Sequence, residues 1–131
     1  MHSVLIVDDE KMIREGLRRI LSSRGYRALT AESGLEALDI MHSEEVHVVL
    51  CDLKMPGMGA IGVLDEAGRD YPGLPVVVFT GHGTSQDALE CMSKGAYEFM
   101  TKPFRIDYLM AVIASAIDKK PPPPRPLDTL A

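Results

Sequence analysis

The chain has 131 residues, of which 46% are hydrophobic and 25% are charged, the composition of one ordinary globular domain. Nineteen acidic and fourteen basic side chains leave a net charge of −5, which argues against a basic nucleic-acid-binding surface on this segment. No apolar run approaches the roughly 18 residues that span a bilayer, and the first residues show no signal-peptide pattern. We therefore expect a cytoplasmic chain that contacts neither nucleic acid nor membrane. Cys51 and Cys91 lack CxxC spacing and are expected to be buried, reduced thiols.

Five short apolar runs, rich in β-branched residues, predict strands that alternate with amphipathic helices. The runs cover residues 4–7, 26–30, 46–51, 75–79 and 97–101. Such continuous apolar strands indicate a parallel sheet that helices cover on both faces. Because crossovers between parallel strands are right-handed, the chain is expected to form an α/β, doubly wound fold of five strands and five helices.

Apolar residues at helical spacing mark the face that each helix is expected to bury. In chain order these residues are Met12, Ile13, Leu17, Ile20 and Leu21; Leu35, Leu38 and Met41; Val63, Leu64 and Ala67; Ala88, Leu89 and Met92; and Leu109, Val112, Ile113, Ala116 and Ile117. Ser33 with Glu36, and Thr84 with Asp87, predict capping boxes at the starts of two helices.

The composition changes abruptly at residue 121. Four consecutive prolines, then Arg125 and Pro126, favour an extended polyproline conformation and cannot continue a helix. We therefore divide the chain into a domain of residues 1–119 and a Pro-rich tail or linker start, residues 120–131, which is expected to add nothing to the core. A ligand for an SH3-like domain is the less favoured interpretation of the tail.

Polar side chains follow four of the five predicted strands. Asp8 and Asp9 follow the first strand, and the later ends carry Asp52, Thr80 and Lys102. Because the carboxyl ends of parallel strands lie on one edge of a sheet, we expect these side chains to converge. Each one alone has a simpler interpretation as a helix cap, a strand end or a surface lysine. Their joint placement favours a binding site.

Three crowded carboxylates repel one another, and a hard divalent cation such as Mg²⁺ relieves that repulsion. Lys102 can balance the remaining negative charge as a flexible cation. A phosphoryl group would then find the cation, Lys102 and the Thr80 hydroxyl around its oxygens. Asp52 stands alone at the centre of this edge, which makes it the best candidate to attack phosphorus and form an aspartyl-phosphate.

The sequence resembles the receiver domain of two-component response regulators over about residues 3–119. The segments that carry the resemblance are LIVDDE at 5–10, DLKMPGM at 52–58, TGH at 80–82 and GAYEFMTKPF at 95–104. The resemblance implies a flavodoxin-like fold with strand order 2-1-3-4-5. It also implies a phosphorylation-activated switch in which Asp52 accepts a phosphoryl group from a sensor histidine kinase.

The resemblance further implies a metal site and its surroundings. Asp9, Asp52 and the backbone carbonyl of Lys54 would hold Mg²⁺, or Mn²⁺ in its place, and Asp8 would reach the ion through water. The Lys54 and His82 side chains would lie at the pocket edge, where they can orient or obstruct an attacking water. His82 is not expected to bind metal, because no second histidine or cysteine stands in register with it.

Thr80 and Phe99 match the switch pair of the family, with Lys102 at the phosphoryl group and a cis bond between Lys102 and Pro103. The signal is expected to leave through residues 84–119, by homodimerisation or partner docking. Two departures are a Gly-Ala pair at 59–60, where the family often has Asp-Gly, and phenylalanine rather than the frequent tyrosine at position 99.

Segments 80–83 and 97–104 are most similar to receivers of transcriptional activators, including the sigma-54-dependent nitrogen-regulatory type. The expected function is therefore regulation of transcription through an output domain outside this chain, with slow autodephosphorylation and no enzymatic turnover. Alternatives are the receiver of a hybrid kinase, a stand-alone phosphorelay receiver and a receiver-like module that works without phosphorylation.

A Mg²⁺-dependent phosphohydrolase is the least favoured alternative. Lys54 stands where that class needs a second acid, two residues after the nucleophile. A flavin- or nucleotide-binding module would need a Gly- or Ser/Thr-rich loop after the first strand, where this chain has Asp-Asp-Glu-Lys.

Overall fold

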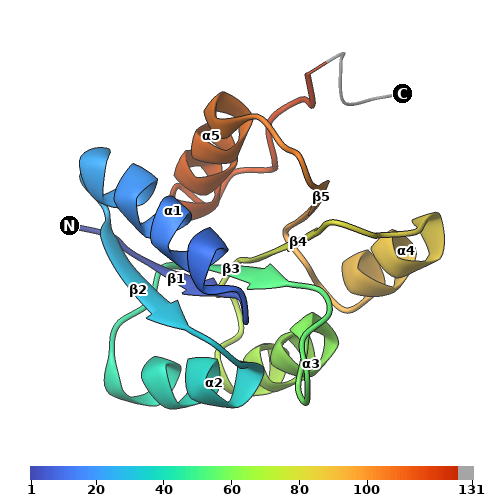
Figure 1. Ribbon diagram of the computed structural model, residues 1–131. Coiled ribbons are helices and arrows are strands. Elements are labelled where there is room, and N and C mark those ends of the chain that lie inside the picture. Colours follow the sequence, from blue (N-terminus) through green and yellow to red (C-terminus); the bar gives the residue numbers. More distant parts are fainter. Residues whose placement is uncertain (127–131) are drawn as a thin grey trace.

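The computed structural model describes residues 1–126 of the chain. Its strands are β1 Ser3–Val7, β2 Arg27–Ala31, β3 Val48–Asp52, β4 Val76–Thr80 and β5 Glu98–Thr101. Its helices are α1 Lys11–Ser23, α2 Gly34–Ser43, α3 Ala60–Asp70, α4 Ser85–Ser93 and α5 Ile106–Ile117. The strands form one parallel sheet in the order β2-β1-β3-β4-β5 (Figure 1). The predicted doubly wound α/β fold and its strand order are confirmed.

Helices cover both faces of the sheet: α1 and α5 lie on one face, and α2, α3 and α4 lie on the other (Figure 1). The three central strands, β1, β3 and β4, are therefore buried along their whole length. Alternate strand residues point to opposite faces. Leu5 and Val7 pack toward α2 and α3, whereas Val4 and Ile6 pack toward α1 and α5. Both cysteines are buried free thiols, as predicted.

Side-chain caps fix the starts of two helices. At α4 the predicted capping box is complete, because Asp87 N–H donates to Thr84 Oγ1 and Thr84 N–H donates to Asp87 Oδ2, both at 3.0 Å. At α2 the Glu36 N–H donates to Ser33 Oγ at 3.1 Å, which is only the first half of the predicted box. None of the helices in the described part of the chain is long and apolar enough to cross a membrane.

Four residues that the helical pattern predicted to be buried are exposed. Their relative exposures are 86% for Met12, 64% for Leu35, 66% for Leu89 and 45% for Met92. Leu35, Leu89 and Met92 each come directly after a helix residue that packs on the core. Because one residue corresponds to about 100° around a helix, their side chains lie beside the buried stripe and not within it. Because each helix touches the sheet along one narrow stripe, apolar residues beside that stripe face solvent.

The Pro-rich tail does contact the domain. Arg125 Nη2 donates to the buried carboxylate of Glu98 in β5 at 2.7 Å, so the prediction that the tail adds nothing to the core is wrong for this residue. Residues 127–131, the rest of the predicted tail, lie outside the described residues.

The loop that follows β3 packs closely on α2 and on its own start. Gly34 N–H donates to the Met58 carbonyl at 3.2 Å, and Ala60 N–H donates to the Leu53 carbonyl at 3.2 Å. A Cβ at Gly34 would lie 2.6 Å from the Met58 carbonyl oxygen, and one at Gly59 would lie 2.6 Å from the Leu53 oxygen. Glycine at position 59, one of the two departures from the family pattern, therefore permits this close backbone approach.

Alanine should have opposite effects at Gly34 and at Gly16. Gly34→Ala forces the backbone near Met58 to move and should lower the free energy of unfolding by about 1–3 kcal/mol. Gly16 lies inside α1 with nothing within 4 Å of a built Cβ, so Gly16→Ala should raise that free energy by about 0.5–1 kcal/mol. Urea unfolding of both variants measures the difference, and effects of the same sign would contradict this packing.

Candidate functional site

Three carboxylates meet at the carboxyl ends of β1 and β3. The register pairs Val7 with Cys51, so Asp8, directly after β1, lies beside Asp52, the last residue of β3. Asp8, Asp9 and Asp52 each place a carboxylate oxygen within 4.8 Å of the other two. Asp8 and Asp52 are buried, with exposures of 0% and 7%, while Asp9 is exposed. The expected convergence of these side chains is therefore present.

Neighbouring groups hold Asp8 in place. Its Oδ1 accepts the Glu10 N–H at 2.8 Å, and its Oδ2 accepts from Lys102 Nζ at 3.4 Å. Arg14 Nη1 donates to the Asp8 backbone carbonyl at 2.8 Å, and its Nη2 lies 3.7 Å from a Glu32 carboxylate oxygen. Arg14 is a neighbour of the site that sequence reasoning missed, since a basic residue six positions after Asp8 looks like an ordinary surface residue of α1.

Burial and mutual repulsion disfavour the charged forms of the two inner carboxylates. Burial raises the pKa of Asp8, although the Glu10 N–H and the Lys102 ammonium act in the opposite direction. Burial, and then the Asp8 charge, raises the pKa of Asp52 to about 6 from its ordinary 3.8, against the lowering effect of Lys102. Such a carboxylate cluster has a strong need for positive charge. Oxygen ligands of this kind suit Mg²⁺ or Mn²⁺.

The ends of β4 and β5 bring Thr80 and Lys102 to the same edge. The Lys102 N–H donates to the Thr80 carbonyl at 2.8 Å, and the Thr80 hydroxyl oxygen accepts the His82 N–H at 3.3 Å. Lys102 Nζ also lies 5.0 Å from the centre of the Phe79 ring. The peptide bond between Lys102 and Pro103 is cis, as the resemblance implied.

Phe99 lies in the layer of side chains beneath Thr80. Its side chain is buried and belongs to the core cluster on the face of the sheet that α2, α3 and α4 cover. A Cβ at Gly83 would lie 2.6 Å from Thr80 Cγ2 and 2.8 Å from Phe99 Cζ. Glycine at position 83 thus lets the loop before α4 touch both residues, a constraint that the sequence pattern did not reveal.

Lys54 and His82, which were expected at the pocket edge, lie in the loops that follow β3 and β4. The Lys54 side chain is 65% exposed, and its Nζ lies 4.0 Å from Asp87 Oδ2 at the start of α4. His82 is exposed and meets the site through its backbone N–H. The structure therefore brings the carboxylates, Thr80 and Lys102 together, and it leaves the side chains of Lys54 and His82 at the periphery.

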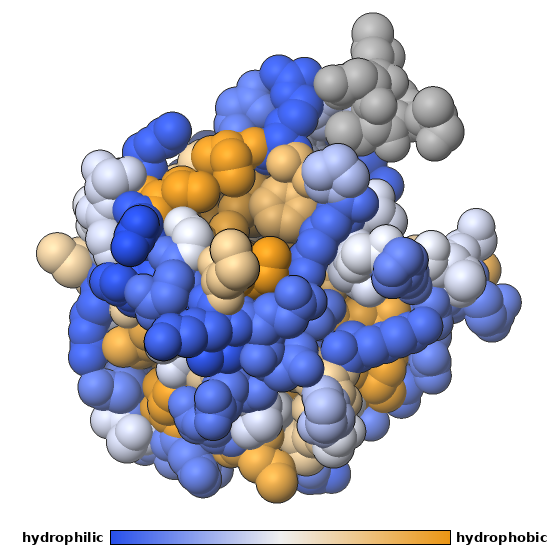
Figure 2. Space-filling model, viewed as in Figure 1, coloured by the Kyte–Doolittle hydropathy of each residue, from blue (hydrophilic) through white to orange (hydrophobic). Residues whose placement is uncertain are grey.

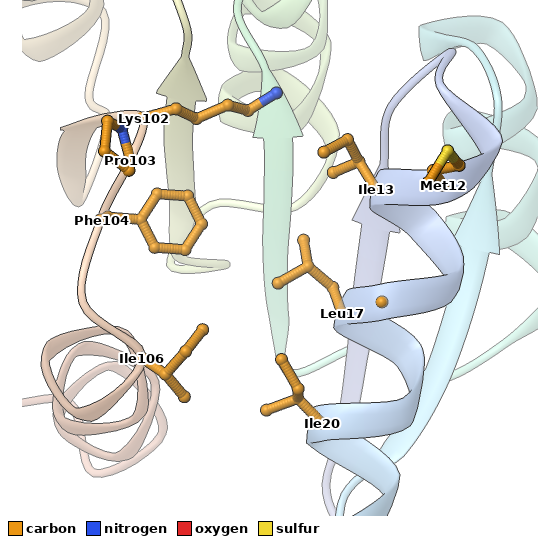
Figure 3. Close-up of a pocket in the computed structure, with 9 residues that line it drawn as sticks. Met12, Ile13, Leu17, Ile20, Lys102, Pro103, Phe104 and Ile106 are labelled. Carbon is orange, nitrogen blue, oxygen red and sulfur yellow. The ribbon is translucent and has the colours of Figure 1, made fainter.

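An apolar groove of about 380 Å³ lies beside Lys102, between α1 and the segment that leads into α5. Figure 2 shows apolar side chains gathered there within a largely polar surface. In Figure 3, Ile13, Leu17 and Ile20 of α1 point toward Phe104 and Ile106 across the groove. A protein that approaches the carboxylates thus meets an apolar surface next to them.

Asp52→Asn should stabilise the metal-free protein at neutral and alkaline pH. The folded pKa of Asp52, about 6, lies above its ordinary 3.8, so the stability that this carboxyl contributes is fully present only below 3.8 and is lost as pH rises through 6. The variant should exceed wild type by about 1–3 kcal/mol at pH 8 and match it at about pH 3.5. Urea unfolding in EDTA across this pH range checks the result, and a difference that does not depend on pH would contradict it.

The family model "Response regulator receiver domain" matches residues 4–114. The transcriptional regulatory protein GlrR of Escherichia coli is 36% identical over 119 residues, covering 91% of this chain and 27% of that protein. The DNA-binding transcriptional regulator NtrC of Klebsiella pneumoniae is 38% identical over 112 residues, covering 86% of this chain and 24% of that protein. The chain thus spans about a quarter of the length of these relatives.

Solved structures agree with this match. A response regulator receiver domain protein from Clostridium thermocellum superposes with a TM-score of 0.86 at 32% identity, covering 91% of this chain and 96% of that one. The beryllofluoride-activated NtrC4 receiver domain dimer gives 0.85 at 34% identity, covering 91% and 98%. With these matches, and with the acidic edge, the threonine and the lysine in place, the chain belongs to the response regulator receiver domain family.

Proposed function

We propose that this receiver is a switch that accepts a phosphoryl group from the phosphohistidine of a sensor histidine kinase onto Asp52. The observation that supports it most directly is the position of Asp52 at the end of the central strand β3, buried between Asp8 on one side and Thr80 on the other. Lys102 adds a cation at the same edge. The groove beside Lys102 offers the donor protein an apolar surface close to the acceptor.

The three carboxylates fit a hard divalent cation, since they converge within 4.8 Å and burial penalises the charge of the inner two. Asp9, Asp52 and the Lys54 backbone carbonyl would hold Mg²⁺ or Mn²⁺, with Asp8 acting through water. When bound, the cation neutralises the carboxylates and draws phosphoryl oxygens to the site. This assignment follows the family resemblance and the donor set of the site together.

The side chains of the chain then have distinct tasks. An Asp52 oxygen forms the new bond to phosphorus as the bond from phosphorus to the donor imidazole nitrogen breaks and its electron pair returns to the ring. Lys102, which now donates to Asp8, can turn its ammonium toward a phosphoryl oxygen. The Thr80 hydroxyl can donate its hydrogen to a second oxygen while still accepting the His82 N–H.

When the Thr80 hydroxyl donates to a phosphoryl oxygen, Thr80 moves toward Asp52, and this movement couples the phosphoryl group to the surface. Gly83 packs closely on both Thr80 and Phe99, so an inward movement of Thr80 opens space that the Phe99 ring and the α4 loop must refill. That rearrangement changes the face formed by residues 84–119. We infer that phosphorylation favours dimerisation through this face. The similar NtrC4 receiver domain, activated by beryllofluoride, is itself a dimer, which supports this inference.

The similarity to GlrR and NtrC supports regulation of transcription through an output domain outside this chain, and hence a cytoplasmic place of action. A receiver of a hybrid kinase or a stand-alone phosphorelay receiver is the second candidate. The exposed Lys54 gives no second acid for a phosphohydrolase, so we expect slow autodephosphorylation rather than turnover.

Asp52→Asn should abolish phosphorylation without loss of the fold, because the amide has the same shape but is no nucleophile. Incubation with acetyl phosphate and Mg²⁺, followed by mass spectrometry, should show one added phosphoryl group on wild type and only background on the variant. Asp39→Asn, at an exposed position of α2, is the matched control and should behave as wild type. Full incorporation into Asp52→Asn would overturn the assignment.

Mg²⁺ should raise the thermal midpoint of the wild-type protein, because it binds the folded carboxylate cluster and not the unfolded chain. At about 100 times the dissociation constant, the added stability is about 2.7 kcal/mol. Asp9→Ala should remove this gain and prevent phosphorylation, whereas Asp39→Asn should keep both. Calorimetry with and without Mg²⁺ tests this, and normal Mg²⁺ stabilisation of Asp9→Ala would contradict the proposed ligands.

Thr80→Ala should accept phosphate on Asp52 but lose most of the phosphorylation-dependent self-association, because it lacks the hydroxyl that contacts the phosphoryl group. Thr80→Ser is the matched variant, since it keeps that hydroxyl and should retain most of the response. Sedimentation equilibrium at equal phosphorylation compares the two. Equal association of Thr80→Ala and wild type would mean that the signal leaves by another route.

A further inference from the structure

The segment that follows α5 turns back across the domain instead of leaving it. Lys119 N–H donates to the Ala116 carbonyl at 3.1 Å and Lys120 N–H donates to the Ser115 carbonyl at 2.9 Å, which is the Schellman arrangement of helix ends. Lys119 adopts the left-handed conformation that this turn requires, with φ 59°. Prolines 121–124 then keep the chain extended, because they cannot rejoin a helix.

Hydrogen bonds fasten the start of this segment to the domain. The Tyr97 hydroxyl donates to the Lys120 carbonyl at 2.7 Å, and Lys119 Nζ donates to the Gly73 carbonyl at 2.7 Å. Figure 1 shows the segment running past α5 and β5 from there. We call residues 120–126 the strap.

Near the end of the strap, Arg125 contacts a polar site on β5 and α5. Arg125 Nη2 donates to Glu98 Oε1 at 2.7 Å and to the Phe99 carbonyl at 3.0 Å. Tyr108 of α5 donates from its hydroxyl to Glu98 Oε2 at 2.5 Å, and the Phe99 N–H donates to Glu98 Oε1 at 2.9 Å. We call the Glu98 carboxylate, the Tyr108 hydroxyl and the Phe99 carbonyl the arginine socket.

The strap accounts for a carboxylate that the fold alone does not explain. Glu98 is 5% exposed and lies on the same side of β5 as Met100, which is a core residue on the α5 face. A buried carboxylate is unfavourable unless it is paired and hydrogen-bonded. Burial by itself raises the pKa of Glu98, but the Arg125, Tyr108 and Phe99 N–H bonds outweigh that effect and lower it. One of the three groups that outweigh burial thus comes from a residue 27 positions later.

The socket lies within the face through which we propose that the receiver signals. β5 is an edge strand, so its outer side has no neighbouring strand in the described sheet. Arg125 bonds the carbonyl of Phe99, the residue whose ring lies next to Gly83 together with Thr80. A second copy of the chain that docks on β5 and α5 would meet the strap first.

We propose that the strap is an autoinhibitory element: Arg125 docks in cis in the arginine socket and covers the β5–α5 surface, so a second copy of the chain associates there only after the strap is released. The docking itself is independent of phosphorylation, whereas the inhibition rests on the proposed function of residues 84–119. Two measurements separate these two parts.

The first measurement tests docking in the 131-residue chain. Arg125→Ala should shift the backbone amide signals of residues 97–101 in NMR spectra, and above all that of Phe99, whose N–H bonds Glu98. Lys120→Ala is the matched control, because it removes one positive charge from the strap but leaves Arg125 in the socket. Arg125→Lys should shift these signals by an intermediate amount, since it keeps the charge but not the guanidinium.

If the amide signals of residues 97–101 are identical in Arg125→Ala and Lys120→Ala, the docking is wrong. The Arg125→Ala shifts should also be the same at low and high protein concentration. Shifts that vanish on dilution would mean that the arginine comes from a second copy, which would overturn docking in cis.

The second measurement tests inhibition by sedimentation equilibrium, with and without acetyl phosphate and Mg²⁺. Arg125→Ala should dimerise with a dissociation constant about tenfold lower than that of wild type and Lys120→Ala, the effect expected for loss of one charge-assisted contact. Equal dissociation constants, or no self-association of any variant, would overturn the inhibition.

Mass spectrometry of the same samples separates the possible failures. If Asp52 carries phosphate and Arg125→Ala still associates like wild type, the inhibition is wrong and the acceptor assignment stands. If Asp52 carries no phosphate, the proposed function is wrong, while the amide shifts still decide whether the strap docks.

Discussion

The register between β1 and β3 is the constraint on which the rest of this structure depends. Because Val7 pairs with Cys51, the two strands end together and hold the buried carboxylates of Asp8 and Asp52 next to each other. Both side chains are buried at the end of the central strands. The sheet therefore maintains a repulsion that, together with burial, raises the Asp52 pKa to about 6, and the Lys102 cation relieves only part of it. A bound cation and a shift of Lys102 toward Asp52 are two ways to relieve the remainder.

The edge strand β5 connects that site to the surface in two directions. Successive residues of a strand point to opposite faces, so Phe99 turns toward Thr80 and the α4 loop, while Glu98 turns toward α5 and Arg125. This short strand thus carries Phe99, the proposed switch aromatic, on one side and the arginine socket on the other. A change at Thr80 and the proposed release of the strap would act on the same short piece of backbone.

Local patterns predicted the elements well but not the surface of the helices. The strand runs, the α4 capping box and the acidic ends of β1 and β3 follow from residue types a few positions apart, and the structure places them as expected. Leu35 and Leu89 were predicted to be buried and are exposed. Periodicity reveals that a helix has an apolar side, but the contact with the sheet decides which apolar residues that side buries.

The sequence alone therefore determined the order of strands and helices and the set of polar residues at the strand ends, since these depend on short-range periodicity and on the geometry of parallel sheets. Only the tertiary structure decided which distant residues meet away from the strand ends. Arg125 bonds Glu98 across 27 positions, and Gly83 admits the close packing of its loop on Thr80 and Phe99. In the sequence, Glu98 looks like any strand glutamate and Gly83 like any loop glycine. Packing selects their partners, and the spacing of residues along the chain does not reveal it.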